Sequence, residues 1–156
     1  MPNSIGRATR DVVSIRRLEL SDIEDVLAIQ RACPEVAQWS ASDYERSVSG
    51  AMAGWVSEDD AGLSGFLVAR SLLGESEILN FGVRPDARGR GIGSQLLQEV
   101  IEWSKRGRDR RILLEVRASN VVAQSFYARL GFQIVGRRGR YYSNPTEEAL
   151  LLDRAL

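Results

Sequence analysis

Three closely spaced glycines stand in the segment Arg88-Gly89-Arg90-Gly91-Ile92-Gly93. Residues 77–83 before it have the composition of a strand, and apolar residues after it recur at helical spacing over residues 92–101. A loop between a strand and a helix leaves backbone amides without partners at the positive end of the helix dipole. The segment therefore predicts an anion site. A tight turn that binds nothing is the alternative.

Residue types in this loop argue against two common nucleotide motifs. A Walker A loop needs lysine before serine or threonine, but here Gly93 precedes Ser94. The dinucleotide pattern Gly-x-Gly-x-x-Gly, read from Gly89, ends on Ser94 instead of glycine. We therefore expect another phosphate-bearing ligand, to which Ser94 donates a hydrogen bond and Arg88 and Arg90 add positive charge.

The remaining sequence predicts a mixed α/β (α+β) fold, with a mostly antiparallel sheet of six to seven strands flanked by about four helices. Strands are expected at residues 12–18, 52–56, 63–70, 77–83, 111–117, 132–136 and 149–152. Helices are expected after the capping-box sequences at 21–24 and 42–45, and at 92–101 and 121–130. Loops are expected at 58–62 and 137–148.

Length and composition indicate one soluble domain. The chain has 156 residues, of which 44% are hydrophobic, and 21 basic residues balance 21 acidic ones. We expect a flexible extension at residues 1–12 and a single domain at 13–156. Balanced charge gives no reason to expect a nucleic-acid partner. No signal-like or membrane-length apolar run is seen, so we expect a cytoplasmic protein that does not contact a membrane.

The absence of histidine narrows the chemistry more than any total does. With no histidine and a single cysteine, Cys33, the usual zinc sites, histidine-based triads and internal disulfides are excluded. We expect no metal. Any acid or base must be a carboxyl, phenol, amine or thiol group.

Five segments, taken together, resemble the GNAT acetyltransferase family, and most closely its branch that acetylates the N-terminal alanine of a ribosomal protein. The glycine loop fits that family's pattern Arg/Gln-x-x-Gly-x-Gly/Ala. The other segments are residues 80–86 (NFGVRPD), 114–120 (LEVRASN), 126–132 (FYARLGF) and 138–142 (RGRYY). Trp39-Ser40 also resembles a Trp-Ser pair of that branch, although Gln38 stands where the branch has proline.

This resemblance implies an enzyme that uses acetyl-coenzyme A to acetylate a protein N-terminus. It implies that the cofactor is bound by Phe81, Gly82, Val83, Arg88, Gly89, Arg90, Gly91, Ile92, Gly93, Ser94, Asn120 and Tyr127. It implies that the acceptor is bound near Trp39, Asn80, Arg117, Tyr141 and Tyr142. The oligomeric state does not follow from the sequence.

Glu115 is the predicted general base. Alternation along the strand at 111–117 sets Glu115 opposite the apolar face, and a carboxylate in a central strand suits base work, directly or through a water. An ion pair with Arg117 or another arginine is the alternative. Glu77 is a second candidate base, since many members of the resembled family use a glutamate on the strand before the glycine loop.

Tyr127 is the predicted general acid. A phenol has a pKa of about 10, above about 8.5 for a thiol, so it can protonate a leaving thiolate. Packing under the helix is the alternative for this ring. Asn120 either caps the helix or, by resemblance, also reaches the cofactor's pantetheine arm.

Proton chemistry favours an α-amine as the acceptor. An α-amino group, with a pKa of about 7.7 to 8.0, is substantially neutral near neutral pH, whereas lysine at about 10.4 is almost wholly protonated. A lysine or small-molecule acceptor and a non-catalytic acyl-coenzyme A sensor remain alternatives. A sensor needs the loop but neither Glu115 nor Tyr127.

Overall fold

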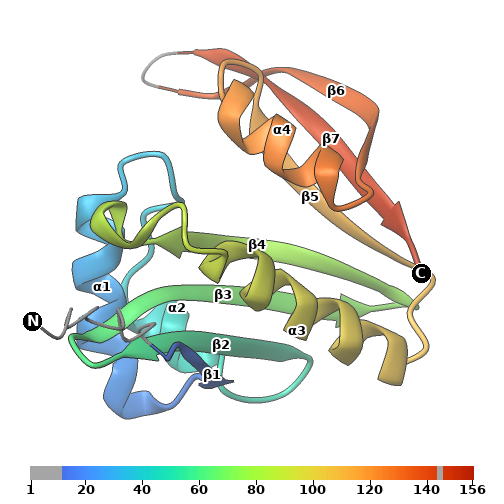
Figure 1. Ribbon diagram of the computed structural model, residues 1–156. Helices are drawn as coiled ribbons and strands as arrows, with labels where there is room; N and C mark the ends of the chain where they lie inside the picture. The colour runs from blue at the N-terminus through green and yellow to red at the C-terminus, as the bar shows by residue number, and fades with distance from the viewer. Residues whose placement is uncertain (1–11, 144–145) are drawn as a thin grey trace, which may run out of the picture.

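The computed structural model describes residues 12–143 and 146–156, which form one seven-stranded sheet with helices on both faces (Figure 1). The extension expected at residues 1–12 lies, except for Val12, outside the described residues. The strands are β1 (Ser14–Arg17), β2 (Met52–Asp59), β3 (Gly62–Leu72), β4 (Glu75–Val83), β5 (Arg111–Arg117), β6 (Gln133–Tyr142) and β7 (Glu147–Ala155). The helices are α1 (Ile23–Ala32), α2 (Ala41–Arg46), α3 (Ile92–Arg106) and α4 (Val121–Arg129), with short 3-10 turns at Leu20–Asp22 and Pro85–Ala87.

Strand order in the sheet is β1-β2-β3-β4-β5-β7-β6, and every neighbouring pair is antiparallel except β4 and β5. The parallel pair is short. It covers only Glu75 to Glu77 against Arg111 to Leu113, after which the two strands diverge (Figure 1). The predicted mixed, mostly antiparallel sheet is confirmed.

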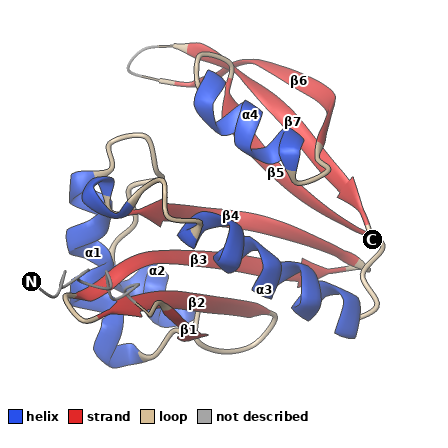
Figure 2. Cartoon of the chain, viewed as in Figure 1, coloured by secondary structure: helices blue, strands red, loops and turns tan. Residues whose placement is uncertain are grey.

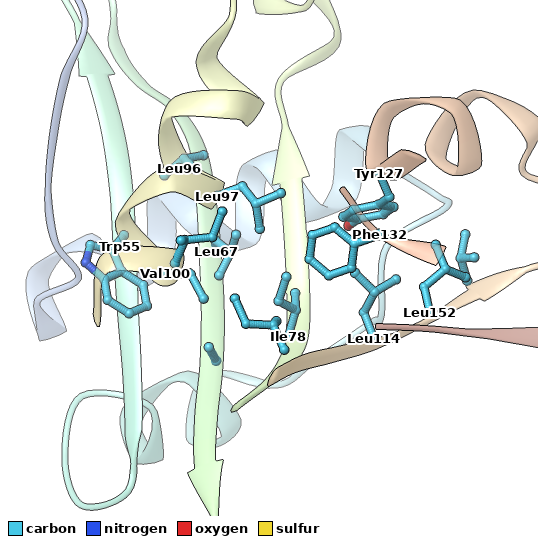
Figure 3. Packing of buried hydrophobic residues seen from close by; sticks show 14 of the residues in the cluster. Trp55, Leu67, Ile78, Leu96, Leu97, Val100, Leu114, Tyr127, Phe132 and Leu152 are labelled. Atoms are coloured by element: carbon cyan, nitrogen blue, oxygen red, sulfur yellow. The ribbon is translucent and has the colours of Figure 1, made fainter. Parts of the chain in front are cut away.

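Two hydrophobic clusters lie on opposite faces of the sheet. Helices α3 and α4 cover one face (Figure 2), where Leu96, Leu97 and Tyr127 pack with residues of both β4 and β5 (Figure 3). Helices α1 and α2 cover the other face, where Val26 and Tyr44 are fully buried. Burial of these apolar side chains is the main force that holds both layers on the sheet.

A β-bulge interrupts β4 at Leu79. Ala69 of β3 pairs with Ile78, and the next residue, Val68, pairs with Asn80, so Leu79 is the extra residue. Because side chains alternate along a strand, the extra residue moves those that follow to opposite faces. Ile78 therefore packs in the α3 cluster, whereas Asn80 bonds to the α2 side.

The two predicted capping boxes are wrong by two residues. The box predicted at 21–24 is replaced by Asp22, whose carboxylate accepts from the Glu19 N–H at 2.8 Å. In α2, Ser40 and Asp43 form the box, with Ser40 N–H donating to Asp43 Oδ2 at 2.8 Å. The same i, i+3 spacing of a polar residue and a carboxylate occurs twice in each segment, two residues apart, and the structure forms the earlier box in both.

The loop predicted at residues 137–148 is also wrong in most of its length. Strand β6 continues to Tyr142, and β7 begins at Glu147. Arg137 pairs with Leu150, and register shifts interrupt the ladder in two places. An exposed edge strand tolerates glycine and arginine, so composition alone made it resemble a loop.

Candidate active site

The divergence of β4 and β5 creates the centre of the candidate site. Beyond Glu77 and Leu113 the strands no longer pair, and aromatic rings bridge part of the space between β4 and α4. The ring centroids of Phe81 and Phe126 are 6.0 Å apart, and those of Phe81 and Tyr127 are 6.4 Å apart. Backbone groups beyond the last pair are therefore available along this edge of β4.

The glycine loop needs glycine for two different reasons. Gly89 has a φ of +79° and Gly91 has a φ of +78°, and a Cβ at either position would meet nothing within 4 Å. These two residues supply a left-handed backbone beside open space. At Gly93 a Cβ would instead lie 3.3 Å from the ring of Phe81, so a small residue is needed for packing.

The start of α3 has the features of an anion site. Its first helical hydrogen bond joins Gln95 N–H to Gly91 O at 3.1 Å, no side chain of the described residues caps the helix, and its first turn has no acidic residue. In the described chain, the amides of Ile92, Gly93 and Ser94 therefore have no intrahelical acceptor. Helices α1 and α2, in contrast, carry acidic residues in their first turns. At the start of α3, no acidic side chain in the first turn offsets the positive end of the helix dipole, so a bound anion can do so.

The side chain of Arg88 turns back toward the end of β4. Its guanidinium pairs with Glu35, and Arg88 Nε donates to Val83 O at 3.1 Å. Burial is the largest single influence and lowers the pKa of Arg88. The attraction of Glu35 and the hydrogen bonds to Glu35 and Cys33 together outweigh it, so the pKa of Arg88 is raised. The Arg88 guanidinium is therefore engaged with Glu35 and the end of β4. Arg90 is exposed.

The end of β4 presents few free amides. Arg84 N–H bonds to Ser64 O of β3 at 2.7 Å, so by alternation the amides of Phe81 and Val83 point toward the open edge. Phe81 N–H donates to the side chain of Asn80 at 3.0 Å. Of the two amides that point toward the open edge, that of Phe81 bonds to the Asn80 side chain. The amide of Val83 is therefore the better placed of the two to bond to a ligand.

Tyr127 lies on α4 with its ring 7% exposed, packed against Phe132 with centroids 5.4 Å apart (Figure 3). Its hydroxyl has no hydrogen bond within the described part of the chain. Burial raises the pKa of Tyr127 well above its ordinary value, so the phenol keeps its proton at neutral pH. This hydroxyl is not among the fully enclosed polar atoms of the described residues that lack a partner, so it keeps some exposure through which it can bond to a ligand atom.

Asn120 caps α4, since its side-chain oxygen accepts from Ala123 N–H at 3.1 Å. The predicted cap is therefore present in the structure. This contact uses one of the two lone-pair positions of the amide oxygen, and the amide nitrogen takes no part in the cap.

Glu115 lies beyond the last β4–β5 pair, on the sheet face opposite Leu114 and Tyr127. Its side chain is 18% exposed, and Arg138 Nη1 approaches Glu115 Oε1 to 3.1 Å. The hydroxyl of Tyr141 also bonds to Glu115, and this bond is the main reason why the pKa of Tyr141 is raised. The ion pair considered as an alternative is thus present, with Arg138 and not with Arg117.

Arg117 and Tyr142 form a neighbouring group. The Arg117 guanidinium lies 4.3 Å from the ring centroid of Tyr142 and pairs with Glu147 at 3.2 Å. Desolvation is the main cause that raises the pKa of Tyr142 to about 12. Tyr141 and Tyr142 are in edge contact at 5.0 Å, so the predicted acceptor residues of β5 and β6 lie together beside Glu115.

Trp39 and Asn80 lie on the α1–α2 side of the sheet. Trp39 packs on Tyr44 with centroids 5.2 Å apart, and Asn80 is only 4% exposed, with its amide bonded inside the protein. Glu77 stands where β4 and β5 are still paired and bonds to Arg70 at 2.7 Å. The rival base is therefore at the closed end of the parallel pair, two positions before Glu115 in register.

Sequence reasoning missed the bulge at Leu79 and the pairing of Arg138 with Glu115. The bulge depends on how β3 and β4 pair, and Arg138 is distant in sequence, so neither had a local signal. Among the described residues, no cluster of carboxyl and thiol groups has the arrangement of a metal site.

Comparison with known proteins identifies the family. Residues 20–132 match the model of the acetyltransferase (GNAT) family. The chain belongs to the GNAT acetyltransferase family. This membership confirms the predicted enzyme class, an acyltransferase, and acetyl-coenzyme A as the acetyl donor.

Relatives from this family match along most of the chain. A Bacillus subtilis protein, provisionally named a [ribosomal protein bS18]-alanine N-acetyltransferase, is 32% identical over 141 residues, covering 89% of this chain and 93% of the relative. The Escherichia coli K12 [ribosomal protein bS18]-alanine N-acetyltransferase is 28% identical over 142 residues, covering 89% and 95%. The predicted resemblance to this branch of the GNAT family is confirmed.

The fold is shared with solved GNAT structures. Arabidopsis thaliana NAA60 in complex with acetyl-CoA superposes with a TM-score of 0.85 at 23% identity, covering 93% of this chain and 99% of that one. In the described residues, no helix is both long and apolar enough to cross a membrane.

Proposed function

We propose that this protein transfers the acetyl group of acetyl-coenzyme A to the N-terminal amine of a protein, with the N-terminal alanine of a ribosomal protein as its acceptor. The observation that carries the proposal is the split between β4 and β5. A carboxylate, Glu115, lies on one face of this split, and Tyr127, a largely buried phenol whose hydroxyl bonds to none of the described residues, lies on the other. An uncapped helix start stands at its edge.

The donor fits this split on three independent grounds. The left-handed Gly89 and Gly91 leave room for a pyrophosphate against the backbone, and the uncapped amides at the start of α3 suit its charge. The strand edge beyond Glu77 offers backbone groups to an amide-rich arm. When bound, acetyl-coenzyme A supplies an activated thioester.

Glu115 and Tyr127 divide the proton transfers between them. Glu115 accepts the proton of the acceptor amine, directly or through a water, and thereby frees its lone pair for attack on the thioester carbon. Tyr127 donates its proton toward the departing sulfur. Burial keeps this phenol protonated, which is the state that a general acid needs.

The acceptor assignment is supported by the names of the two relatives, both of which refer to the alanine N-terminus of bS18. An α-amine is also the easier nucleophile for a single carboxylate, because its pKa is about 7.7 to 8.0 against about 10.4 for lysine. Tyr141 and Tyr142 flank the carboxylate and offer rings to the first residues of a peptide. A ribosomal acceptor would place the enzyme in the cytoplasm, where ribosomal proteins are made.

A peptide panel tests the proposal. The full chain is incubated with acetyl-coenzyme A and either an alanine-led peptide with the N-terminal sequence of bS18 or the same peptide with a blocked N-terminus and an internal lysine. We expect mass spectrometry to show acetylation of the free α-amine only. Acetylation of the blocked peptide alone would reassign the enzyme to lysine, and acetyl-coenzyme A binding without transfer to either peptide would favour a sensor.

A further inference from the structure

A buried polar network joins the β4 bulge to the loop between α1 and α2, residues 33–40, which we term the acceptor loop. Asn80 is at its centre. The side-chain nitrogen of Asn80 donates to Ala37 O and to the Tyr44 hydroxyl, both at 3.0 Å. Its side-chain oxygen accepts from Phe81 N–H, also at 3.0 Å. One amide thus bonds to the acceptor loop, to α2 and to the strand edge beside the split.

The network holds the acceptor loop at a second carbonyl. The Tyr44 hydroxyl donates to Gln30 Oε1 at 2.5 Å, and Gln30 Nε2 donates to Trp39 O at 2.9 Å. Ala37 and Trp39 are therefore fixed by side chains that bond to one another. The loop has no regular secondary structure between residues 33 and 40, apart from turns, so these bonds replace a backbone ladder.

Burial makes this network costly to leave incomplete. Asn80 is 4% exposed, Gln30 is 5% exposed and Tyr44 is fully buried among apolar side chains. Both amide hydrogens of Asn80 have acceptors, and its oxygen has a donor. In a low-dielectric interior, a fully satisfied network of this kind specifies one arrangement, because any other leaves a buried polar group unpaired.

Close packing at the next inward position supports the same arrangement. A Cβ on Gly82 would lie 3.2 Å from Val36 Cγ1 and 3.0 Å from the ring of Phe66. The acceptor loop therefore touches β4 at Gly82 as well as at Asn80. The bulge at Leu79 makes this possible, since it turns Asn80 away from the face on which Ile78 packs.

We propose that Asn80 is a positioning residue that holds the acceptor loop against β4 and so sets where the acceptor's N-terminus lies relative to the acetyl group. The role rests on the proposed N-terminal acetylation. Asn80 does not contact the acceptor in this assignment, because its amide is buried and fully bonded. The loop backbone, with Trp39 packed on Tyr44, forms a wall whose place is fixed before the acceptor arrives.

Two substitutions test this role. Tyr44→Phe keeps the ring that packs on Trp39 and Phe66 but removes the hydroxyl that links Asn80 to Gln30. Asn80→Asp keeps an acceptor for Phe81 N–H but removes the N–H donors to Ala37 O and to the Tyr44 hydroxyl. For each we expect about a tenfold rise in the KM of an alanine-led peptide, because acceptor binding must then order a loop that the wild-type protein already holds in place. The KM of acetyl-coenzyme A and kcat should stay within about twofold.

Hydrogen–deuterium exchange gives a readout that does not depend on catalysis. In both variants we expect faster exchange at the amides of the acceptor loop and unchanged exchange in β5. The matched control is Ser104→Ala, which removes another buried bond, from Ser104 Oγ to Ser76 Oγ at 2.7 Å, on the opposite face of the sheet. It should change neither the acceptor KM nor exchange in the loop.

Several outcomes would overturn the assignment. One is unchanged hydrogen exchange in the acceptor loop of folded Tyr44→Phe. Another is an acceptor KM that changes no more in Tyr44→Phe than in the control Ser104→Ala. If Asn80→Asp does not fold, Tyr44→Phe decides the question alone. If the wild-type protein acetylates no N-terminal amine, the proposed function fails, while loop exchange still decides whether Asn80 holds the loop.

Discussion

Replacing Tyr127 with phenylalanine separates catalysis from stability unusually well. The hydroxyl of Tyr127 has no hydrogen bond in the described parts of the chain, although the residue is 7% exposed. Its removal therefore breaks no bond and leaves the ring contacts with Phe81, Phe126 and Phe132 in place. We expect the free energy of unfolding of Tyr127→Phe to equal that of the wild type within about 0.5 kcal/mol, which is the usual range of changes that remove no contact.

Catalysis should respond very differently. General acid catalysis is typically worth about a hundredfold to ten-thousandfold. At about 1.36 kcal/mol per tenfold, this corresponds to roughly 2.7 to 5.4 kcal/mol of transition-state stabilisation. We expect Tyr127→Phe to lose at least a hundredfold in the rate of acetyl transfer, with the affinity for acetyl-coenzyme A nearly unchanged.

Single-turnover acetylation of an alanine-led peptide is the appropriate assay, because slow product release can mask a chemical step in steady-state rates. Tyr44→Phe is the matched control for stability. It also removes a phenolic hydroxyl, but one that makes two hydrogen bonds, so it should lower the melting temperature by several degrees where Tyr127→Phe does not.

A folded Tyr127→Phe protein that transfers acetyl as fast as the wild type in a single turnover would refute the assignment of the acid. A large loss of thermal stability would contradict the reading of the hydroxyl as unpaired. Because burial raises the pKa of Tyr127, we also expect no loss of single-turnover rate through its ionisation between about pH 7 and 9.

Three further predictions concern the loop, the base and acid stability. Gly91→Val places a β-branched residue at a φ of +78°, so acetyl-coenzyme A affinity should fall at least tenfold by calorimetry, and unchanged affinity in a folded variant would remove the loop from the site. Glu115→Gln should reduce kcat at least a hundredfold and leave cofactor affinity intact, whereas Glu77→Gln should change kcat less than threefold; the reverse order would make Glu77 the base. The bond from Arg16 lowers the pKa of Asp22 below its ordinary value of 3.8, so this carboxylate stabilises the fold above that pH and ceases to do so as pH falls through the lowered pKa. Acid titration of unfolding should therefore be less steep for Asp22→Asn than for the wild type, and parallel curves would contradict the argument.

Local patterns predicted the elements next to the split with good accuracy. The strand expected at 111–117 has the same bounds in the structure, because its apolar and β-branched residues are bounded by an arginine at each end. The glycine loop and α3 follow from spacing alone, and Gly131, with a φ of +90°, ends α4 as expected. Alternation also set Glu115 on the face opposite Leu114, where the structure has it.

Features that depend on partners distant in sequence could not be predicted in the same way. Asn80 appeared to be a residue that touches the acceptor, but the bulge turns it into the α1–α2 side, and the bulge arises from pairing with β3. The ion pair of Arg138 with Glu115 needs β6 to run beside β7 and β5, while its glycines and arginines resembled those of a loop. Pairing geometry, more than composition, decided both.

The short parallel ladder between β4 and β5 affects which part of the fold unfolds locally. Strands β5, β7 and β6 pair only with one another beyond it, so the last 46 residues, 111–156, form a nearly self-contained unit of backbone pairing. This unit joins the remainder mainly through side chains such as Tyr127 and Phe132 in the α3 cluster. Side-chain contacts break more readily than a ladder of backbone hydrogen bonds. We therefore expect residues 111–143 and 146–156 to behave as a separate cooperative unit, with its boundary between β4 and β5, in native-state hydrogen exchange. A ligand bound between β4 and β5 would hold the two units together, and its removal would increase hydrogen exchange in the carboxyl-terminal unit first.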